Sequence, residues 1–322
     1  MELSLYNLFG VGAFFRSRSF LPKNVKVVEV GPRDGLQNEK QIISLEAKVE
    51  LIHKLASTGL SHIEVGSFVS PKWVPQMADT PQLFEALERR QILTYSVLTP
   101  NMKGLQSAVE VNVKEVAVFA AASELFSQRN INCSISQSLS NYRAVCDEAI
   151  SKGIKVRGYV SCVYGCPYEG EVDADAVLNI TKDLLAMGCY EVSLGDTIGV
   201  GDPTQVDSLL SRLHDADVPL DRIAVHFHDT GDKAVANILV ALQHGIRVID
   251  SSVAGLGGCP YAEGASGNVA TEDVVYILGV LGIESGVDLS KLMDASRYIN
   301  SVLTRHTASK LVKSRSRVLA DL

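Results

Sequence analysis

From residue 24 onward, short runs rich in valine and isoleucine alternate with longer amphipathic stretches that stop at glycine. The stops are Gly59, Gly153, Gly188 and Gly245, and a new apolar run begins shortly after each of them. Glycine is favoured just past the end of a helix because it adopts left-handed backbone angles without strain. The alternation therefore predicts βα units and a parallel sheet.

The apolar runs that qualify as strands are eight in number. They cover residues 25–30, 62–65, 93–98, 115–119, 155–160, 191–194, 223–228 and 248–252. Eight similar units favour a closed (β/α)₈ barrel over an open doubly wound sheet, and no G-x-G-x-x-G turn follows the first strand. We therefore predict an α/β fold, a TIM barrel, with additional C-terminal helices from about residue 271.

No linker-like composition interrupts the chain after its first 22 residues. We expect residues 1–22 to form a leader and residues 23–322 to form one catalytic domain. The leader holds Arg16, Arg18 and three serines with a single acidic residue, Glu2. This composition is typical of a mitochondrial presequence, although Glu2 also fits a frayed terminus. The expected location is the mitochondrial matrix if the leader is a presequence, and the cytoplasm otherwise.

Charge and hydropathy exclude two classes of partner. The net charge of −7, from 30 basic and 37 acidic residues, argues against binding to nucleic acid, which requires basic surfaces. No apolar run approaches the ~20 residues that span a bilayer, so we expect no membrane contact. The 46% hydrophobic content supports a large core.

Polar residues gather where the predicted strands end, which is where TIM-barrel enzymes place their active sites. The run GPRDGLQNEK puts Arg33 and Asp34 after the first strand, and His226 and His228 lie in AVHFHDT. Residues two apart on a strand face the same side, so both imidazoles should project into the barrel mouth. They either share a divalent metal or hydrogen-bond to neighbouring loops.

Two further residues complete a candidate ligand set. Asp34 offers a carboxylate and Asn268 an amide oxygen, although Asn268 could instead cap the helix that follows it. Two nitrogens and two hard oxygens suit Mg²⁺ or Mn²⁺ better than a closed zinc site. Cys162 and Cys166 have zinc-like spacing, but no second pair matches them.

Arg33 and Cys259 are the remaining candidates for chemistry. An arginine at this place can stabilise a developing oxyanion, whereas the ordinary alternative is a surface ion pair. Cys259 lies in the glycine-dense run GLGGCPYAEGASG, which we expect to close over the mouth and bring the thiol to the substrate. The alternative is a small buried thiol.

Several longer motifs carry a resemblance to a known family. They include GPRDGLQNEK, GSFVSPKWVPQM, RGYVSC, GCYEVSLGDTIGVG and SSVAGLGGCPYAEGASGNVATEDVVY. From about residue 21 to its end, the chain resembles the 3-hydroxy-3-methylglutaryl-CoA (HMG-CoA) lyase family, whose signature is the GLGGCP loop. The resemblance implies a pyruvate carboxyltransferase-like barrel that cleaves HMG-CoA to acetyl-CoA and acetoacetate, in leucine breakdown and ketone-body formation.

The resemblance also assigns roles to individual residues. It implies a homodimer with Mg²⁺ or Mn²⁺ held by Asp34, His226, His228 and Asn268. The catalytic groups that it implies are Cys259, His226 and Arg33, with support from Glu64, Asp196 and Glu272. The acyl-CoA contacts that it implies are Arg33, Lys40, Thr304 and His306.

The chain departs from the family pattern at two places, and two alternative functions remain. The chain reads GDK at residues 231–233 where the family typically has YGQ, and Thr304 and His306 replace an asparagine and a lysine associated with CoA binding. We therefore expect altered CoA affinity. The alternatives are a related acyl-CoA-dependent metallo-synthase that performs a Claisen condensation, and an inactive barrel that serves as a binding module.

Overall fold

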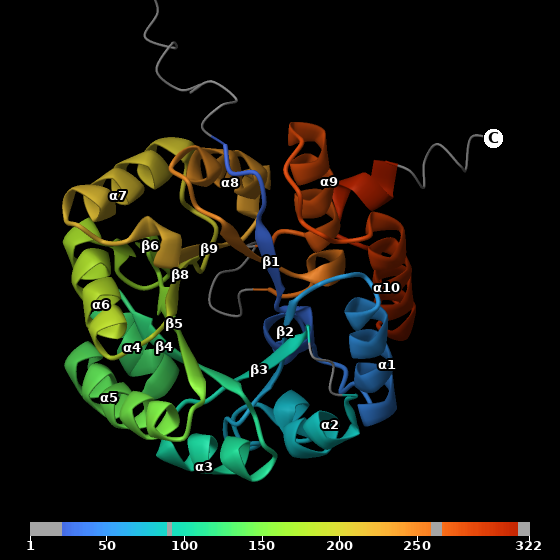
Figure 1. The fold of residues 1–322 in the computed structure, drawn as a ribbon, viewed down its shortest axis with the longest axis horizontal. Helices are drawn as coiled ribbons and strands as arrows, with labels where there is room; N and C mark the ends of the chain where they lie inside the picture. Colours follow the sequence, from blue (N-terminus) through green and yellow to red (C-terminus); the bar gives the residue numbers. More distant parts are fainter. Residues whose placement is uncertain (1–20, 89–91, 259–265, 315–322) are drawn as a thin grey trace, which may run out of the picture.

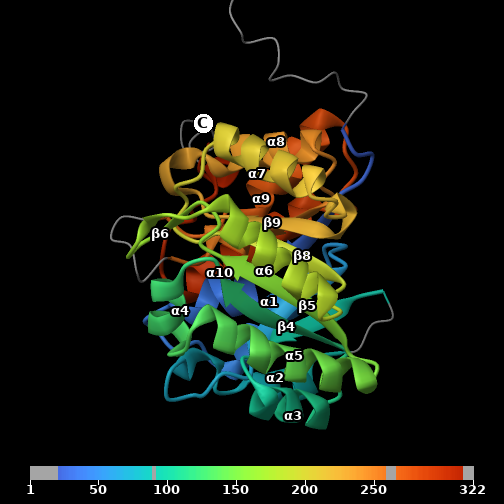
Figure 2. The same ribbon diagram turned by 90° about the vertical axis from the view of Figure 1, so that its left-hand side faces the viewer.

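The computed structural model describes residues 21–88, 92–258 and 266–314. Within these ranges, eight parallel strands close into a barrel in the order β1-β10-β9-β8-β5-β4-β3-β2 (Figures 1 and 2). The strands are β1 (Lys26–Glu29), β2 (His62–Ser67), β3 (Thr94–Leu98), β4 (Glu115–Ala121), β5 (Lys155–Ser161), β8 (Glu191–Asp196), β9 (Ile223–Phe227) and β10 (Val248–Ser251). Each strand overlaps one of the eight predicted runs, so the predicted TIM barrel is confirmed.

Helices surround the barrel and cover its apolar outer face (Figure 1). They are α1 (Leu45–Ala56), α2 (Thr80–Ala86), α3 (Met102–Glu110), α4 (Glu124–Ile131), α5 (Ile135–Ser151), α6 (Ala174–Ala186), α7 (Pro203–Asp215), α8 (Ala234–Gln243), α9 (Thr271–Leu281) and α10 (Leu289–Val302). The predicted C-terminal helices are α9 and α10. Helix α10 packs beside α1, where the Tyr298 hydroxyl donates to the Ala47 carbonyl oxygen at 3.4 Å. None of the helices in the described ranges has the length and hydropathy needed to cross a membrane.

The predicted glycine stops have the left-handed backbone that the pattern required. Gly59, Gly153, Gly188 and Gly245 all have positive φ. Gly59 has a second reason to lack a side chain, because a Cβ there would lie 2.3 Å from the Gly286 carbonyl oxygen. Helix α1 can therefore turn directly into β2 beneath the loop that precedes α10.

Charged side chains occupy the inside of the barrel, where such barrels usually hold branched apolar residues. Arg157 on β5 is 2% exposed and forms ion pairs with Glu191 on β8 and Asp250 on β10. Lys26 on β1 pairs with the other oxygen of Glu191 at 2.8 Å. The interior therefore carries a row of alternating charges that leads toward the mouth.

Candidate active site

The carboxyl ends of the strands surround a cavity of about 740 Å³. Its lining includes Arg33, Asp34, His226 and His228, which come from the loop after β1 and from the end of β9. The sequence analysis had placed these four residues at a barrel mouth, and the structure brings them together there. The volume falls in the range of small-molecule and cofactor sites.

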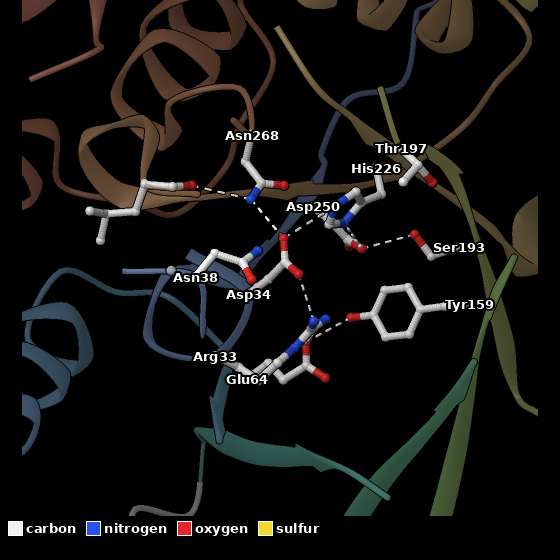
Figure 3. Close-up of polar contacts among 12 residues, drawn as sticks. Arg33, Asp34, Asn38, Glu64, Tyr159, Ser193, Thr197, His226, Asp250 and Asn268 are labelled. Atoms are coloured by element: carbon white, nitrogen blue, oxygen red, sulfur yellow. Dashed lines mark hydrogen bonds and ion pairs between the residues drawn. The ribbon is translucent and has the colours of Figure 1, made fainter. Parts of the chain in front are cut away.

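Three of these residues form a compact cluster of potential metal ligands. Ligand atoms of Asp34, His226 and His228 all lie within 4.8 Å of one another, the only such cluster in the described part of the chain. The two imidazole centroids are 5.6 Å apart, as expected for alternate residues on one strand face. Asn268 joins them because its amide nitrogen donates to Asp34 Oδ2 at 2.8 Å (Figure 3).

The helix-cap alternative for Asn268 is wrong. Helix α9 begins at Thr271, and the residue at its N-cap is Ala270. Asn268 instead forms an isolated bridge with His228 and directs its amide toward Asp34 and the Leu256 carbonyl oxygen. Its position therefore serves the cluster and not the helix.

The electrostatics of the cluster fit a divalent cation. Burial and the neighbouring His226 lower the pKa of His228 to about 4. Burial acts to raise the pKa of Asp34, but Arg33 and both histidines outweigh it and hold this pKa at about 2. A neutral imidazole and an ionised carboxylate are the states that metal ligands require. His228 Nδ1 is also buried without a hydrogen-bond partner among the described residues, as expected of a nitrogen reserved for an ion.

Arg33 is a buried part of the site, so the surface ion-pair alternative is wrong. Its Nη1 donates to Asp34 Oδ1 at 2.6 Å, while Nε and Nη2 donate to Glu64 Oε2 at 3.0 and 2.8 Å. The Tyr159 hydroxyl donates to the same Glu64 oxygen at 3.0 Å. Glu64 therefore orients the guanidinium, and the predicted supporting role of Glu64 has a concrete geometry (Figure 3).

Asp196 and Glu272 lie outside the cavity lining and hold backbone loops. Asp196 accepts the amide hydrogens of Val200 and Gly201 at 3.1 and 2.9 Å, and burial raises its pKa to about 6. Glu272 accepts the Ala254 amide hydrogen at 3.0 Å, just before the glycine-rich loop. Both carboxylates therefore shape loops at the mouth.

Sequence reasoning missed Glu29, which lies beside Glu272 and links two active-site loops. Its Oε1 accepts the amide hydrogens of Gly31 and Val253, both at 2.8 Å. Burial raises the pKa of both Glu29 and Glu272 to about 7. The two carboxyls therefore hold their protons more tightly in the folded chain than in the unfolded chain.

This difference predicts a pH dependence of stability. The contribution of each carboxyl favours the folded state near pH 5 and is lost as the pH rises through about 7. Glu272→Gln should therefore reduce the fall in the free energy of unfolding between pH 5 and pH 8 by on the order of 1 to 3 kcal/mol. Urea unfolding at both pH values measures it, with Glu284→Gln as an exposed control. An unchanged slope in Glu272→Gln would contradict the prediction.

Of the four residues expected to contact CoA, Arg33 lines the cavity and the other three do not. Lys40, Thr304 and His306 are all exposed, and none of them lines the cavity. An ion pair of 2.8 Å between Arg305 and Glu39 holds the segment that contains Lys40 beside the segment that contains Thr304 and His306. Thr304 has a φ of 51°, which is strained for a β-branched residue and natural for the asparagine that the family pattern has there.

The altered GDK loop is tied to the C-terminal segment. Asp232 and the preceding Asp229 both pair with Lys310, at 3.2 and 2.6 Å, and Lys233 donates to the Val200 carbonyl oxygen at 2.8 Å. The loop is therefore held by Lys310 on one side and by the Val200 carbonyl oxygen on the other. The adjacent His226 and His228 remain in the metal-ligand cluster.

The cysteine predictions have different outcomes. Cys259 lies outside the described residues, so its role stays a prediction. Cys162 and Cys166 are buried thiols, and Cys166 accepts a hydrogen bond from the Ser123 hydroxyl at 2.9 Å. Neither belongs to a metal cluster in the described ranges.

Three further polar residues escaped the sequence analysis because they lie inside apolar runs. Arg157 and Tyr159 occur in KVRGYV, and Asp250 occurs in RVIDS. Two guanidinium groups lie near the Tyr159 ring, that of Arg157 at 4.9 Å and that of Arg33 at 5.6 Å from its centroid. The sequence did contain a signal for Arg157 and Asp250. A charged residue in the middle of a predicted buried strand needs a buried partner.

Comparison with known proteins identifies the family. The model of the HMGL-like family matches residues 24–299. The chain belongs to the HMGL-like family. Among relatives of this HMGL-like chain, the mitochondrial hydroxymethylglutaryl-CoA lyase of Pongo abelii is 56% identical over 298 residues, 92% of this chain and 91% of that protein.

Two bacterial proteins extend the comparison of this HMGL-like chain. A 3-hydroxy-3-isohexenylglutaryl-CoA/hydroxy-methylglutaryl-CoA lyase of Pseudomonas aeruginosa is 55% identical, covering 91% of this chain and 98% of that protein. The structure of an HMG-CoA lyase from Acinetobacter baumannii in complex with coenzyme A and 3-methylmalate has a TM-score of 0.86 at 35% identity, covering 93% of this chain and 96% of that one.

Proposed function

We propose that the chain is a metal-dependent carbon–carbon lyase that cleaves HMG-CoA to acetyl-CoA and acetoacetate. The observation that carries the proposal is the Asp34, His226 and His228 cluster with the Arg33 guanidinium beside it at one barrel mouth. Membership of the HMGL-like family and identity above 50% to HMG-CoA lyases support the same reaction.

The reaction breaks the bond between carbons 2 and 3 of the acyl group. The tertiary hydroxyl loses its proton, its oxygen becomes the ketone of acetoacetate, and the electrons of the broken bond form the enolate of acetyl-CoA. Arg33 is placed to stabilise the enolate oxygen because Glu64 and Asp34 fix its guanidinium at the cavity wall. We assign the delivery of a proton to the enolate carbon to Cys259, and the removal of the hydroxyl proton to His226 or a neighbouring carboxylate.

The ion would be Mg²⁺ or Mn²⁺, held by Asp34, His226, His228 and Asn268. A bound divalent cation acidifies a coordinated hydroxyl and orients the substrate. The mixed nitrogen and oxygen donors, with substrate oxygens to complete the set, favour a hard, six-coordinate cation over a tetrahedral zinc. Glu64, Asp196 and Glu272 support this arrangement by holding Arg33 and the adjoining loops.

The test is acetoacetate release from the purified chain. Treatment with EDTA should abolish the reaction, and Mg²⁺ or Mn²⁺ should restore it, because the bound cation would acidify the substrate hydroxyl. His228→Ala should weaken binding of Mn²⁺, whereas His244→Ala, a histidine away from the cavity, should not. Full activity in metal-free protein would contradict the assignment.

The same assay separates the alternatives. A metallo-synthase would consume acetyl-CoA and a keto acid, and an inactive binding module would release no acetoacetate at any metal concentration. The intact ligand set and the buried Arg33 favour an enzyme over the inactive module. The GLGGCP run with Cys259 favours the lyase over the synthase.

A second candidate activity is cleavage of substrates with longer groups on carbon 3. Val74, Leu98 and Phe126 line the side of the cavity formed by the β2, β3 and β4 ends, whereas the metal cluster lies toward β1 and β9. Polar residues such as Asn101 and Arg129 share that side, but an apolar substituent can pack against the three apolar side chains, and the name of one relative includes an isohexenyl substrate. Turnover of 3-alkyl homologues of HMG-CoA tests this, and loss of it in Val74→Trp with HMG-CoA cleavage retained would support the assignment.

For the CoA portion, we assign contacts to Arg33, Lys40, Thr304 and His306, since the β1 loop and the 304–306 segment lie together. Residues 1–22 would direct the chain to the mitochondrial matrix, as the name of the Pongo abelii relative supports. We further propose a homodimer. N-terminal sequencing of the mature protein and light scattering test the last two points.

A further inference from the structure

Asp250 gathers four hydrogen bonds in the barrel interior, directly below the metal cluster. Its carboxylate is 1% exposed and accepts from Arg157 Nη1 and Nη2 at 3.0 and 2.8 Å. The Ser193 hydroxyl donates to Oδ2 at 2.8 Å, and His226 Nδ1 lies 3.2 Å from the same oxygen (Figure 3). Asp250 and His226 are register partners on the paired strands β10 and β9, which places them side by side.

This contact determines which nitrogen of His226 carries the hydrogen. A carboxylate that already accepts three donors has no hydrogen to offer, so the hydrogen between the two groups belongs to Nδ1. In a neutral imidazole, Nε2 then carries the free lone pair. Nε2 lies 3.7 Å from Asp34 Oδ2, so it faces the cluster.

The two histidines of the cluster therefore differ. His226 has a carboxylate behind its ring, whereas the His228 ring has a backbone partner, at Ser266, and a free Nδ1. In the described part of the chain, a carboxylate holds only the His226 ring from behind. Hydrogen bonds of this kind commonly orient ligating histidines and raise their basicity.

We propose that Asp250 is a positioning residue that fixes the tautomer and direction of the His226 ring, with Arg157 holding Asp250 in place. The proposal rests on the proposed function only in assigning the Nε2 atom to a metal or substrate. Arg157 is in turn paired with Glu191 through Nε at 2.8 Å, and Glu191 with Lys26. The interior row of charges thus ends at the active site.

Asp250→Asn tests the proposal because an amide has one accepting oxygen where the carboxylate has two. Arg157 donates to both carboxylate oxygens, and its shorter bond, from Nη2, is to Oδ1. We expect the amide oxygen to take the place of Oδ1 and the amide nitrogen the place of Oδ2, where it can donate to the Ser193 hydroxyl and to His226. His226 Nδ1 must then accept, which moves the hydrogen to Nε2. Nitrogen-15 NMR of histidine-labelled, metal-free protein should show this tautomer change, and Mn²⁺ titration should show on the order of 10- to 100-fold weaker binding.

Two matched variants separate positioning from packing. Ser193→Ala removes a hydrogen bond to the same oxygen but leaves His226 paired, so its tautomer and Mn²⁺ affinity should stay at wild-type values. Asp250→Asn with Arg157→Met removes the competing donor, so the amide oxygen can accept from Nδ1 and the wild-type tautomer should return. The double variant also avoids an unpaired buried charge if Asp250→Asn alone fails to fold.

The proposal is overturned if His226 keeps its hydrogen on Nδ1 in folded Asp250→Asn. It is also overturned if the hydrogen does not return to Nδ1 in the double variant. Unchanged Mn²⁺ affinity in Asp250→Asn with only a lower Tm would also overturn it, because that pattern belongs to a packing role. The NMR measurement needs neither metal nor substrate. A tautomer change in a protein without lyase activity would therefore support the positioning role while contradicting the proposed function.

Discussion

Replacing Cys259 with serine is expected to lower kcat by ~10²–10⁴-fold while metal and substrate binding persist. A hydroxyl releases its proton far less readily than a thiol, so serine preserves size but cannot supply the proton to the enolate carbon. Gly258, the preceding residue, lines the cavity, and its carbonyl oxygen accepts from the Asn38 amide at 3.3 Å. Acetoacetate release, measured over a range of substrate concentrations, gives kcat and KM separately.

A thiol-directed alkylating reagent provides an independent check. It should inactivate the wild-type chain, and substrate should protect it. Cys133→Ser is the control: it should be inactivated by the reagent as the wild-type chain is, because Cys133 is half-buried and does not line the cavity. Normal turnover in Cys259→Ser together with a lower Tm would show that Cys259 is a structural thiol.

Replacing Arg33 with lysine should lower kcat on the order of 10²-fold or more. Three nitrogens of the Arg33 fork already contact Asp34 and Glu64, and the remaining N–H groups are held rigidly for the substrate. A lysine ammonium cannot satisfy two buried carboxylates and an enolate oxygen in that geometry. Mn²⁺ affinity should change little, because the proposed ligands are untouched.

The control for Arg33 is another arginine of the same cavity. Arg129 lies over the Tyr168 ring at 4.6 Å, away from the cluster, so Arg129→Lys should leave kcat near the wild-type value. Near-normal turnover in Arg33→Lys would mean that Arg33 only positions Asp34. A large loss of Mn²⁺ affinity in Arg33→Lys would lead to the same conclusion.

Much of the fold could be predicted because its signals are local. The eight strands and the helix ends at Gly59 and Gly188 follow from apolar periodicity and from the left-handed backbone that glycine permits. The same local geometry put His226 and His228 on one strand face. Asp34 was found because the turn after the first strand places its side chain at the mouth of any such barrel.

Contacts between strands could not be predicted in the same way. Asp250 meets His226 only because β10 pairs with β9 in one particular register, and Arg157 reaches Asp250 across the closed barrel. Glu29 joins Gly31 to Val253, residues separated by most of the chain. Such pairs have no sequence spacing of their own, since strand register and barrel closure determine them.

By itself, the sequence determined the barrel and placed two imidazoles and a carboxylate at its mouth, because these depend on local periodicity and on side-chain chemistry; the roles of the reactive groups stay predictions. The tertiary structure alone decided that Arg33 is buried between Glu64 and Asp34, and that Asn268 faces Asp34 instead of capping α9. It also decided that the His226 ring is backed by the Asp250 carboxylate and the His228 ring by a backbone group of Ser266. The physical reason is that burial and long-range pairing, which set orientation and pKa, exist only once the barrel has closed.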